Sequence, residues 1–144
     1  MKYFIAYWLP PLIWMGFMFP TNDALTADST SFIIIPLIKL LMPNASQYTL
    51  DTLHELVRKA SHFISYGFLT LLLFRAFRGK TKIFYWKWIF YAGLISISYG
   101  FLDEFSQAFI PSRTGSLYDW LIDSSGIIFT SVIIYIKGFK LSKA

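Results

Sequence analysis

The sequence predicts an all-α, polytopic integral membrane protein with about four transmembrane helices and one short re-entrant or interfacial segment. The chain of 144 residues is 56% hydrophobic and 20% aromatic, and its mean hydropathy of +0.52 exceeds that of ordinary soluble domains. Four apolar stretches approach the roughly 20 residues that a helix needs to cross a bilayer. With no repeat and no Gly/Ser/Pro-rich linker, residues 1–144 are expected to form a single domain.

The charge pattern points to a membrane and not to nucleic acid. The net charge is +5, but the basic residues gather at the ends of the apolar stretches. Membrane topology and anionic lipid favour this placement, so we expect no nucleic-acid partner. The chain has no cysteine, which excludes disulfides and thiolate chemistry.

The first predicted span, residues 3–19, is apolar throughout but contains Pro10 and Pro11. Proline removes a backbone donor, so the helix should kink there. A cleaved signal peptide is the alternative. Retention is favoured because Lys2 alone is a weak basic n-region and residues 25–27 form a poor cleavage site.

The next apolar segment, residues 31–42, contains Pro36 and Lys39 and is too short to span, which favours a re-entrant or interfacial placement. After a polar linker, Thr52 and Glu55 match a capping box, which predicts a second spanning helix over about residues 52–77.

The third and fourth predicted helices cover about residues 84–105 and 119–136. Clusters of basic residues flank the turn near residue 80 and follow the fourth helix. The positive-inside tendency therefore predicts a multi-pass protein of the cell membrane with both termini cytoplasmic and the 103–119 loop extracytoplasmic.

Three ionisable residues on three predicted helices reach a similar depth. At about 1.5 Å per residue from the inner basic ends, His62 lies about 20 Å up its helix, Glu104 about 25 Å and Asp123 about 21 Å. Ionisable groups at membrane depth are costly and are functional candidates by default. Each of the three helices has a polar stripe, and the three stripes should face one another because lipid cannot satisfy them. The stripes are Lys59, His62 and Tyr66; Ser96, Tyr99 or Gly100, Asp103 and Gln107; and Ser116, Asp119, Asp123 and Gly126.

A purely structural role is the alternative for this cluster. Glu104 with Gln107, or Asp119 with Arg113, could cap helix ends and fix the loop between them. His62 by itself is more often a hydrogen-bonded helix residue than a ligand.

The motif residues resemble the VanZ-like family. The family pattern is a lysine–histidine–tyrosine helix followed by an acid–glutamine–arginine–aspartate signature. This chain has Lys59-x-x-His62-x-x-x-Tyr66, then Asp103-Glu104-x-x-Gln107, and then Arg113-x-x-Ser116-x-x-Asp119-x-x-x-Asp123. The resemblance covers about residues 58–136 and implies a polytopic membrane protein associated with resistance to teicoplanin, a glycopeptide antibiotic with a lipid tail. The family usually has asparagine where this chain has Asp123.

Three functions are open from the sequence. The first is a site for an amphiphile at the outer leaflet, in which Lys59 and Arg113 hold an anionic headgroup and the apolar helices take the tail. Glu104, Asp119 and Gln107 would orient these cations or accept hydrogen bonds from the headgroup. The ligand would be a membrane lipid, a lipid-linked cell-envelope intermediate or a lipoglycopeptide antibiotic.

The second function is a membrane enzyme acting on such lipids, with His62 or Glu104 as general base. No cofactor is required by the sequence, although one histidine among carboxylates would suit Mg²⁺ or Ca²⁺ better than zinc. The third is a non-catalytic assembly factor or transporter, in which small residues such as Gly93 permit close helix packing.

Overall fold

The computed structural model describes residues 1–19, 27–81, 83–107, 109 and 116–141. Within these ranges every regular element is a helix, which confirms the all-α prediction. The helices are α1 (Lys2–Tyr7), α2 (Leu9–Met18), α3 (Ala27–Leu41), α4 (Gln47–Arg78), α5 (Trp86–Gln107) and α6 (Leu117–Leu141).

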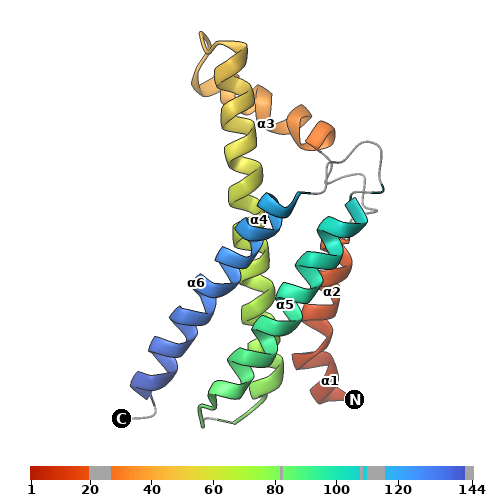
Figure 1. Ribbon diagram of the computed structural model, residues 1–144, viewed down its shortest axis with the longest axis vertical. Coiled ribbons are helices and arrows are strands. Elements are labelled where there is room, and N and C mark those ends of the chain that lie inside the picture. The colour runs from red at the N-terminus through yellow and green to blue at the C-terminus, as the bar shows by residue number, and fades with distance from the viewer. Residues whose placement is uncertain (20–26, 82, 108, 110–115, 142–144) are drawn as a thin grey trace.

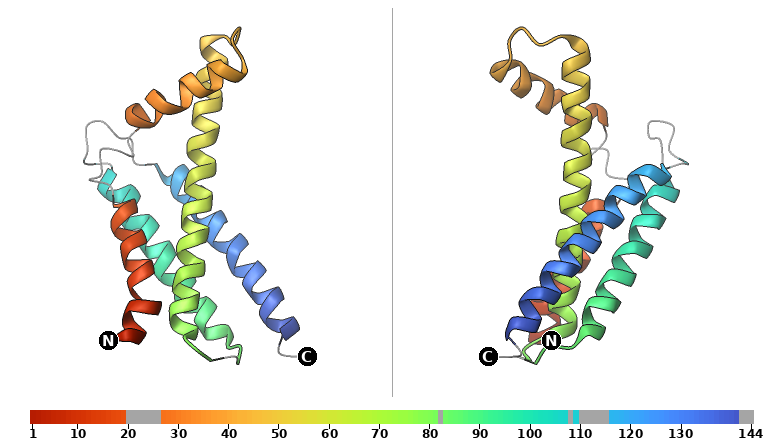
Figure 2. Two further views of the ribbon diagram at one scale, coloured as in Figure 1. Left: turned by 180° about the vertical axis from the view of Figure 1, so that it is seen from behind. Right: turned by 60° about the vertical axis from the view of Figure 1, so that its left-hand side comes forward.

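Helix α4 is the centre of the fold. It has 32 residues, or about 48 Å at 1.5 Å per residue, and it contacts each of the other described helices. Figures 1 and 2 show α5 and α6 packed beside its second half, α1 and α2 running alongside, and α3 lying across its first turns. The first turns of α4 project beyond α5 and α6.

The start of α4 corrects the sequence prediction. Its N-cap is Ser46, whose Oγ accepts a hydrogen bond from the backbone N–H of Thr49 at 3.2 Å. Thr52 lies inside the helix and donates from Oγ1 to the carbonyl of Tyr48 at 2.8 Å. The predicted capping box of Thr52 and Glu55 is therefore wrong, because Ser46 already satisfies an unpaired amide of the first turn.

The predicted interruption of the N-terminal helix is present, at Trp8. Helix α1 ends and α2 begins there, and Pro10 and Pro11 lie in the first turn of α2, where a missing N–H breaks no helical bond. Two side chains attach α2 to the bundle. The indole of Trp14 donates to a backbone carbonyl of α4 at 3.1 Å, and the hydroxyl of Tyr99 donates to one of α2 at 2.6 Å.

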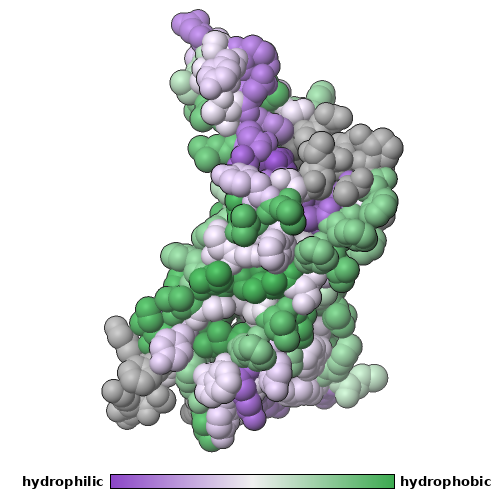
Figure 3. Space-filling model, viewed as in Figure 1, coloured by the Kyte–Doolittle hydropathy of each residue, from purple (hydrophilic) through white to green (hydrophobic). Residues whose placement is uncertain are grey.

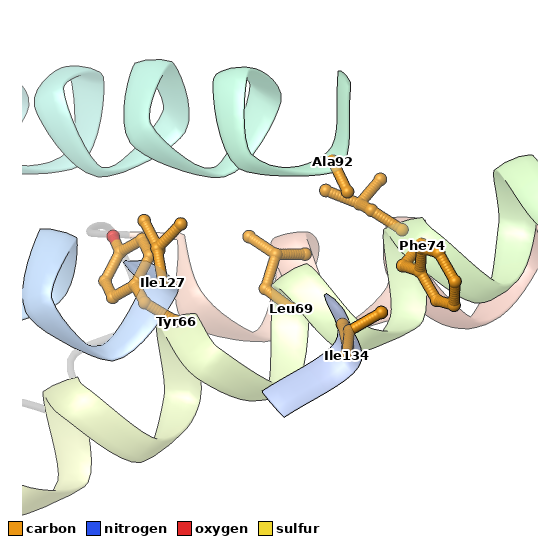
Figure 4. Packing of buried hydrophobic residues seen from close by; sticks show 7 residues of the cluster. Tyr66, Leu69, Phe74, Ala92, Ile127 and Ile134 are labelled. Atoms are coloured by element: carbon orange, nitrogen blue, oxygen red, sulfur yellow. The ribbon is translucent and has the colours of Figure 1, made fainter. Parts of the chain in front are cut away.

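The apolar core lies where α4, α5 and α6 meet, mainly along the second half of α4 (Figure 4). Helix α6 approaches the backbone of α4 closely at Gly126, where a Cβ atom would collide with the carbonyl oxygen of Phe63. A glycine is thus required for this packing. The buried core residues are Tyr66, Leu69, Leu73, Phe74, Ala92, Ile127 and Ile134.

The outer surfaces of the helices are largely apolar. Four spans were predicted. Among the described residues, two helical segments are long and apolar enough to cross a membrane, namely Gln47–Arg78 and Leu117–Gly138. In the most apolar 18-residue stretch of each segment, only 39% and 22%, respectively, is buried within the protein. Figure 3 shows hydrophobic residues across the middle of the molecule and hydrophilic residues toward its two ends. This distribution differs from that of a soluble protein, whose apolar helix faces are covered.

The two ends of the molecule differ in charge. The start of α1, the end of α6 and the α4–α5 turn lie together at one end (Figure 1). Basic residues are concentrated in these segments: Lys2, Arg75, Arg78, Lys80, Lys87 and Lys137. The acidic residues of α5 and α6 lie toward the opposite ends of those helices, namely Asp103, Glu104, Asp119 and Asp123.

Candidate functional site

A cluster of buried carboxylates lies where the last turns of α5 meet the first turns of α6 and the middle of α4. We call Asp103, Glu104, Asp119 and Asp123 the acidic cluster. Their exposed fractions are 5%, 6%, 6% and 0%, respectively. Acidic side chains are rarely buried to this extent unless they are paired, so the contacts of each one decide what the cluster can do.

One face of α4 supplies partners for three of the four carboxylates. The partners lie four residues apart along the helix and therefore on one stripe. Each contact joins a successive turn of α4 to α5 or α6, so the three polar stripes meet. The contacts are Arg58 Nη2 to Asp119 Oδ2 at 3.1 Å, His62 Nδ1 to Asp123 Oδ1 at 3.1 Å, and the Tyr66 hydroxyl to Asp103 Oδ2 at 2.7 Å.

The fourth carboxylate, Glu104, holds the start of α6. Its Oε2 accepts a hydrogen bond from the backbone N–H of Ser116 at 2.9 Å, and a carboxylate is stabilised near a helix N-terminus. The Oγ of Ser116 accepts a hydrogen bond from the backbone N–H of Tyr118 at 3.1 Å. One oxygen of Glu104 and the side chain of Ser116 therefore have structural roles. The structural alternative expected such a role for Glu104, but with Gln107 as its partner.

Some carboxylate oxygens of the cluster are buried without a hydrogen-bond partner among the described residues, and one of them on each of α5 and α6 matters here. These two atoms are Oε1 of Glu104 and Oδ2 of Asp123. A buried acceptor left unpaired costs about 1–3 kcal/mol, and more when it is charged. Such atoms in folded proteins bind a ligand, a cation or water. The cluster is therefore not closed by its own side chains.

Three potential metal ligands are close together in the same place. His62, Glu104 and Asp123 each offer one ligand atom, and these atoms all lie within 4.8 Å of one another. Each residue comes from a different helix: α4, α5 and α6.

Cationic side chains lie beside the cluster on α4, about 20 residues or about 30 Å of helix before its basic end, which is the thickness of a hydrocarbon core. Glu55 accepts two hydrogen bonds from Arg58, at 2.9 and 3.0 Å, and pairs with Lys59 at 3.1 Å. The hydrogen bonds from Arg58, aided by Lys59, hold the pKa of Glu55 at about 2. The Nζ of Lys59 also lies 5.1 Å from the centre of the Tyr118 ring, within the range of a cation–π contact.

The polar contacts extend one turn further along α4, to Thr70. Thr70 Oγ1 lies 3.0 Å from Ser96 Oγ, and both residues are fully buried. Beyond this pair, α4 presents Leu73 and Phe74 to its neighbours.

An apolar groove of about 530 Å³ runs between α5 and α6. Ile97 and Ile127 line the end nearer to the acidic cluster, and Trp86 and Tyr135 line the end nearer to the basic end of the molecule. A polar site and an apolar groove are thus adjacent along the same helix pair.

The structure brings most of the predicted site residues together. Gln107 is buried at the end of α5, with 7% of its surface exposed. Arg113 lies outside the described residues. The predicted residues in or beside the cluster are Lys59, His62, Tyr66, Asp103, Glu104, Ser116, Asp119 and Asp123.

Two participants were not predicted as site residues, Arg58 and Thr70. The sequence carried a signal for both, because Arg58, His62, Tyr66 and Thr70 form a series with a spacing of four residues. The predicted stripe began with Lys59 instead, which lies one position away from that series.

A sequence profile of the VanZ/LLP1 family matches residues 4–138. The chain belongs to the VanZ/LLP1 family. This confirms the resemblance seen in the motif residues and extends it to α1 and α2. No curated protein and no solved structure matches the chain significantly. Together with the two candidate spans, membership in the VanZ/LLP1 family indicates a membrane protein.

Proposed function

We propose that this VanZ/LLP1 family member binds the headgroup of an amphiphilic cell-envelope compound in its acidic cluster, at the extracytoplasmic face of the cell membrane. The ligand would be a membrane lipid, a lipid-linked cell-envelope intermediate or a lipid-tailed glycopeptide such as teicoplanin, whose capture would contribute to resistance. One observation carries this proposal: a buried polar cluster with two unpartnered oxygens adjoins an apolar groove on the same two helices.

The proposed membrane placement has four spans. Helices α4 and α6 are two of them, and α5, with 22 residues, is long enough to be a third. Helices α1 and α2 together would form the fourth, with α3 at the interface. The shared basic end would lie in the cytoplasm with both termini, and residues 103–119, from the end of α5 to the start of α6, would lie outside.

The headgroup would be recognised by two kinds of group. Ionised carboxylates only accept hydrogen bonds, so Glu104 and Asp123 suit the hydroxyl, amide or ammonium groups of a sugar or peptide. Lys59, beside the cluster, and Arg113, in the loop between α5 and α6, would pair with phosphate or carboxylate. The groove between α5 and α6 has the apolar lining that an acyl chain requires.

The test is a comparison of ligand binding and protection. Arg113→Ala and Glu104→Gln should weaken binding of teicoplanin to the purified protein by at least about 10-fold, the effect of losing one charge-assisted hydrogen bond. In cells they should abolish any protection against teicoplanin without reducing the amount of protein in the membrane. Asp51→Asn, an exposed carboxylate on α4, is the matched control and should behave as wild type. Full protection by the Arg113 variant would refute the proposal for this ligand.

A second candidate function is catalysis on a lipid-linked substrate. It is favoured by the contact between His62 and Asp123, since an imidazole oriented by a carboxylate is a common general base. Turnover of a purified lipid phosphate ester that is lost in His62→Phe and Glu104→Gln would support catalysis. Binding without turnover would leave the first function alone.

A further inference from the structure

The positions of His62, Glu104 and Asp123 meet a geometric requirement for binding one metal ion. Neighbouring ligands of an ion with bonds of about 2.1 Å lie about 3 Å apart, and opposite ligands about 4.2 Å apart. All three ligand atoms lie within 4.8 Å of one another. Closing the set around an ion therefore needs side-chain shifts of about 1 Å or less, given those bond lengths.

The unpartnered oxygens provide a second and independent observation. Glu104 and Asp123 are 6% and 0% exposed, and each has one buried oxygen without a hydrogen-bond partner in the part of the chain that the structure describes. The other oxygen of each carboxylate is engaged, by the backbone N–H of Ser116 and by His62. In each carboxylate one oxygen is thus fixed by a hydrogen bond and the other is available to a metal ion. Hydrogen bonds of this kind commonly orient metal ligands.

The described cations near the cluster are committed elsewhere. Arg58 bonds Asp119 and Glu55, and Lys59 pairs with Glu55. None of these contacts involves the carboxylate of Glu104 or Asp123. Two adjacent buried carboxylates with one imidazole have more negative charge than a single protonated histidine offsets, which favours a divalent cation.

We propose that His62, Glu104 and Asp123 bind one divalent metal ion at the junction of α4, α5 and α6. The sequence alone favoured Mg²⁺ or Ca²⁺, because carboxylates predominate. The structure revises that expectation, because it places the imidazole of His62 within the ligand set, and an imidazole favours an ion of intermediate softness, Mn²⁺ or Zn²⁺. Three protein ligands leave at least one coordination position for water or for an oxygen atom of a ligand. The site rests on its own geometry and does not require the amphiphile.

The experiment measures metal bound to the full-length protein in detergent, with no amphiphile added. After incubation with Mn²⁺ or Zn²⁺ and removal of free ions, the wild type should retain about one ion per chain, as one three-ligand site predicts. Glu104→Gln and Asp123→Asn should raise the dissociation constant by at least about 100-fold, because changes to mere supporting residues already cost 10–100-fold. Asp119→Asn removes the same charge one turn earlier on α6 and should retain the ion.

Several results would overturn the proposal. Wild-type protein that binds no more metal than Asp123→Asn would contradict the site. If Asp119→Asn lost as much metal as Asp123→Asn, metal retention would reflect only the total negative charge, and the site would be refuted. Selective retention of Mg²⁺ or Ca²⁺ would refute the choice of ion. Gel filtration and circular dichroism identify any variant that misfolds. His62→Phe, which removes a ligand without removing a carboxylate, then supplies the second test and should also lose the ion.

Discussion

Helix α4 contacts α5 and α6 in two different ways along its length. We call residues 58–66 the polar half of this contact and residues 69–74 the apolar half. From Arg58 to Tyr66, α4 meets α5 and α6 through three polar contacts with buried carboxylates. From Leu69 to Phe74 it meets them mainly through apolar side chains. Packing alone satisfies the apolar half, whereas the polar half includes two unpartnered carboxylate oxygens among the described residues. Burying such groups costs free energy, which supports the function proposed for the polar half.

The largest loss of stability is expected where α6 approaches the backbone of α4 at Phe63, within the polar half. Gly126→Val should destabilise the protein by about 3 kcal/mol, since the added side chain collides with backbone that cannot rotate away. Gly16→Val is the matched control, because a Cβ at Gly16 meets no other heavy atom within 4 Å. Thermal unfolding in detergent should separate the two variants clearly. Equal melting temperatures would show that the α4–α6 approach is looser than described.

A smaller loss of stability is expected when the contact between Arg58 and Asp119, the first of the polar half, is broken. Arg58→Ala leaves Asp119 buried without its cation, and should cost about 2 kcal/mol, less than for a fully buried pair because 28% of the Arg58 side chain is exposed. The double variant with Asp119→Ala should recover part of the loss, since no unpaired carboxylate remains at that position. A double-mutant cycle on unfolding free energies measures this coupling. Strict additivity of the two changes would contradict the contact.

The smallest loss of stability is expected at the ion pairs of Glu55, one turn before the polar half of α4. Glu55→Gln should cost less than about 1 kcal/mol, because Glu55 and its cations are partly exposed to solvent. The pKa of Glu55 is lowered to about 2 in the folded protein. Its stabilisation is therefore present above its ordinary pKa of 4.5 and is lost as the pH falls toward 2. The difference in melting temperature between wild type and variant should shrink over that pH range and in high salt. A difference at pH 2 as large as that at neutral pH would contradict the ion pair.

Much of the helical layout followed from the sequence, because long apolar stretches bounded by basic residues leave few alternatives to helices. The grouping of His62, Glu104 and Asp123 followed from their similar depths. The start of α4 did not, because Ser46 and Thr52 both lie in a polar stretch and either suits an N-cap. Arg58 was missed because moving one residue along a helix turns the side chain by about 100°, so the choice between Arg58 and Lys59 decides which residue faces the cluster.

The number of spans was also harder to predict than the helices themselves. Helix α5 has 22 residues and carries Lys87, Asp103 and Glu104. Such a helix is long enough to cross a bilayer, yet its polar residues lower its hydropathy, so its placement depends on neighbours that cover them. The break at Trp8 likewise divides the N-terminal segment into two helices that are individually short.

The central claim is that the acidic cluster opens to the outer surface while the basic end lies in the cytoplasm. The chain contains no cysteine, so single cysteines report without background. Tyr118→Cys lies beside the cluster, where Tyr118 is 62% exposed, and Lys80→Cys lies in the turn at the basic end. In intact cells a membrane-impermeant maleimide should label the first and should reach the second only after permeabilisation. Labelling of Lys80→Cys alone, or of both positions, in intact cells would contradict the account.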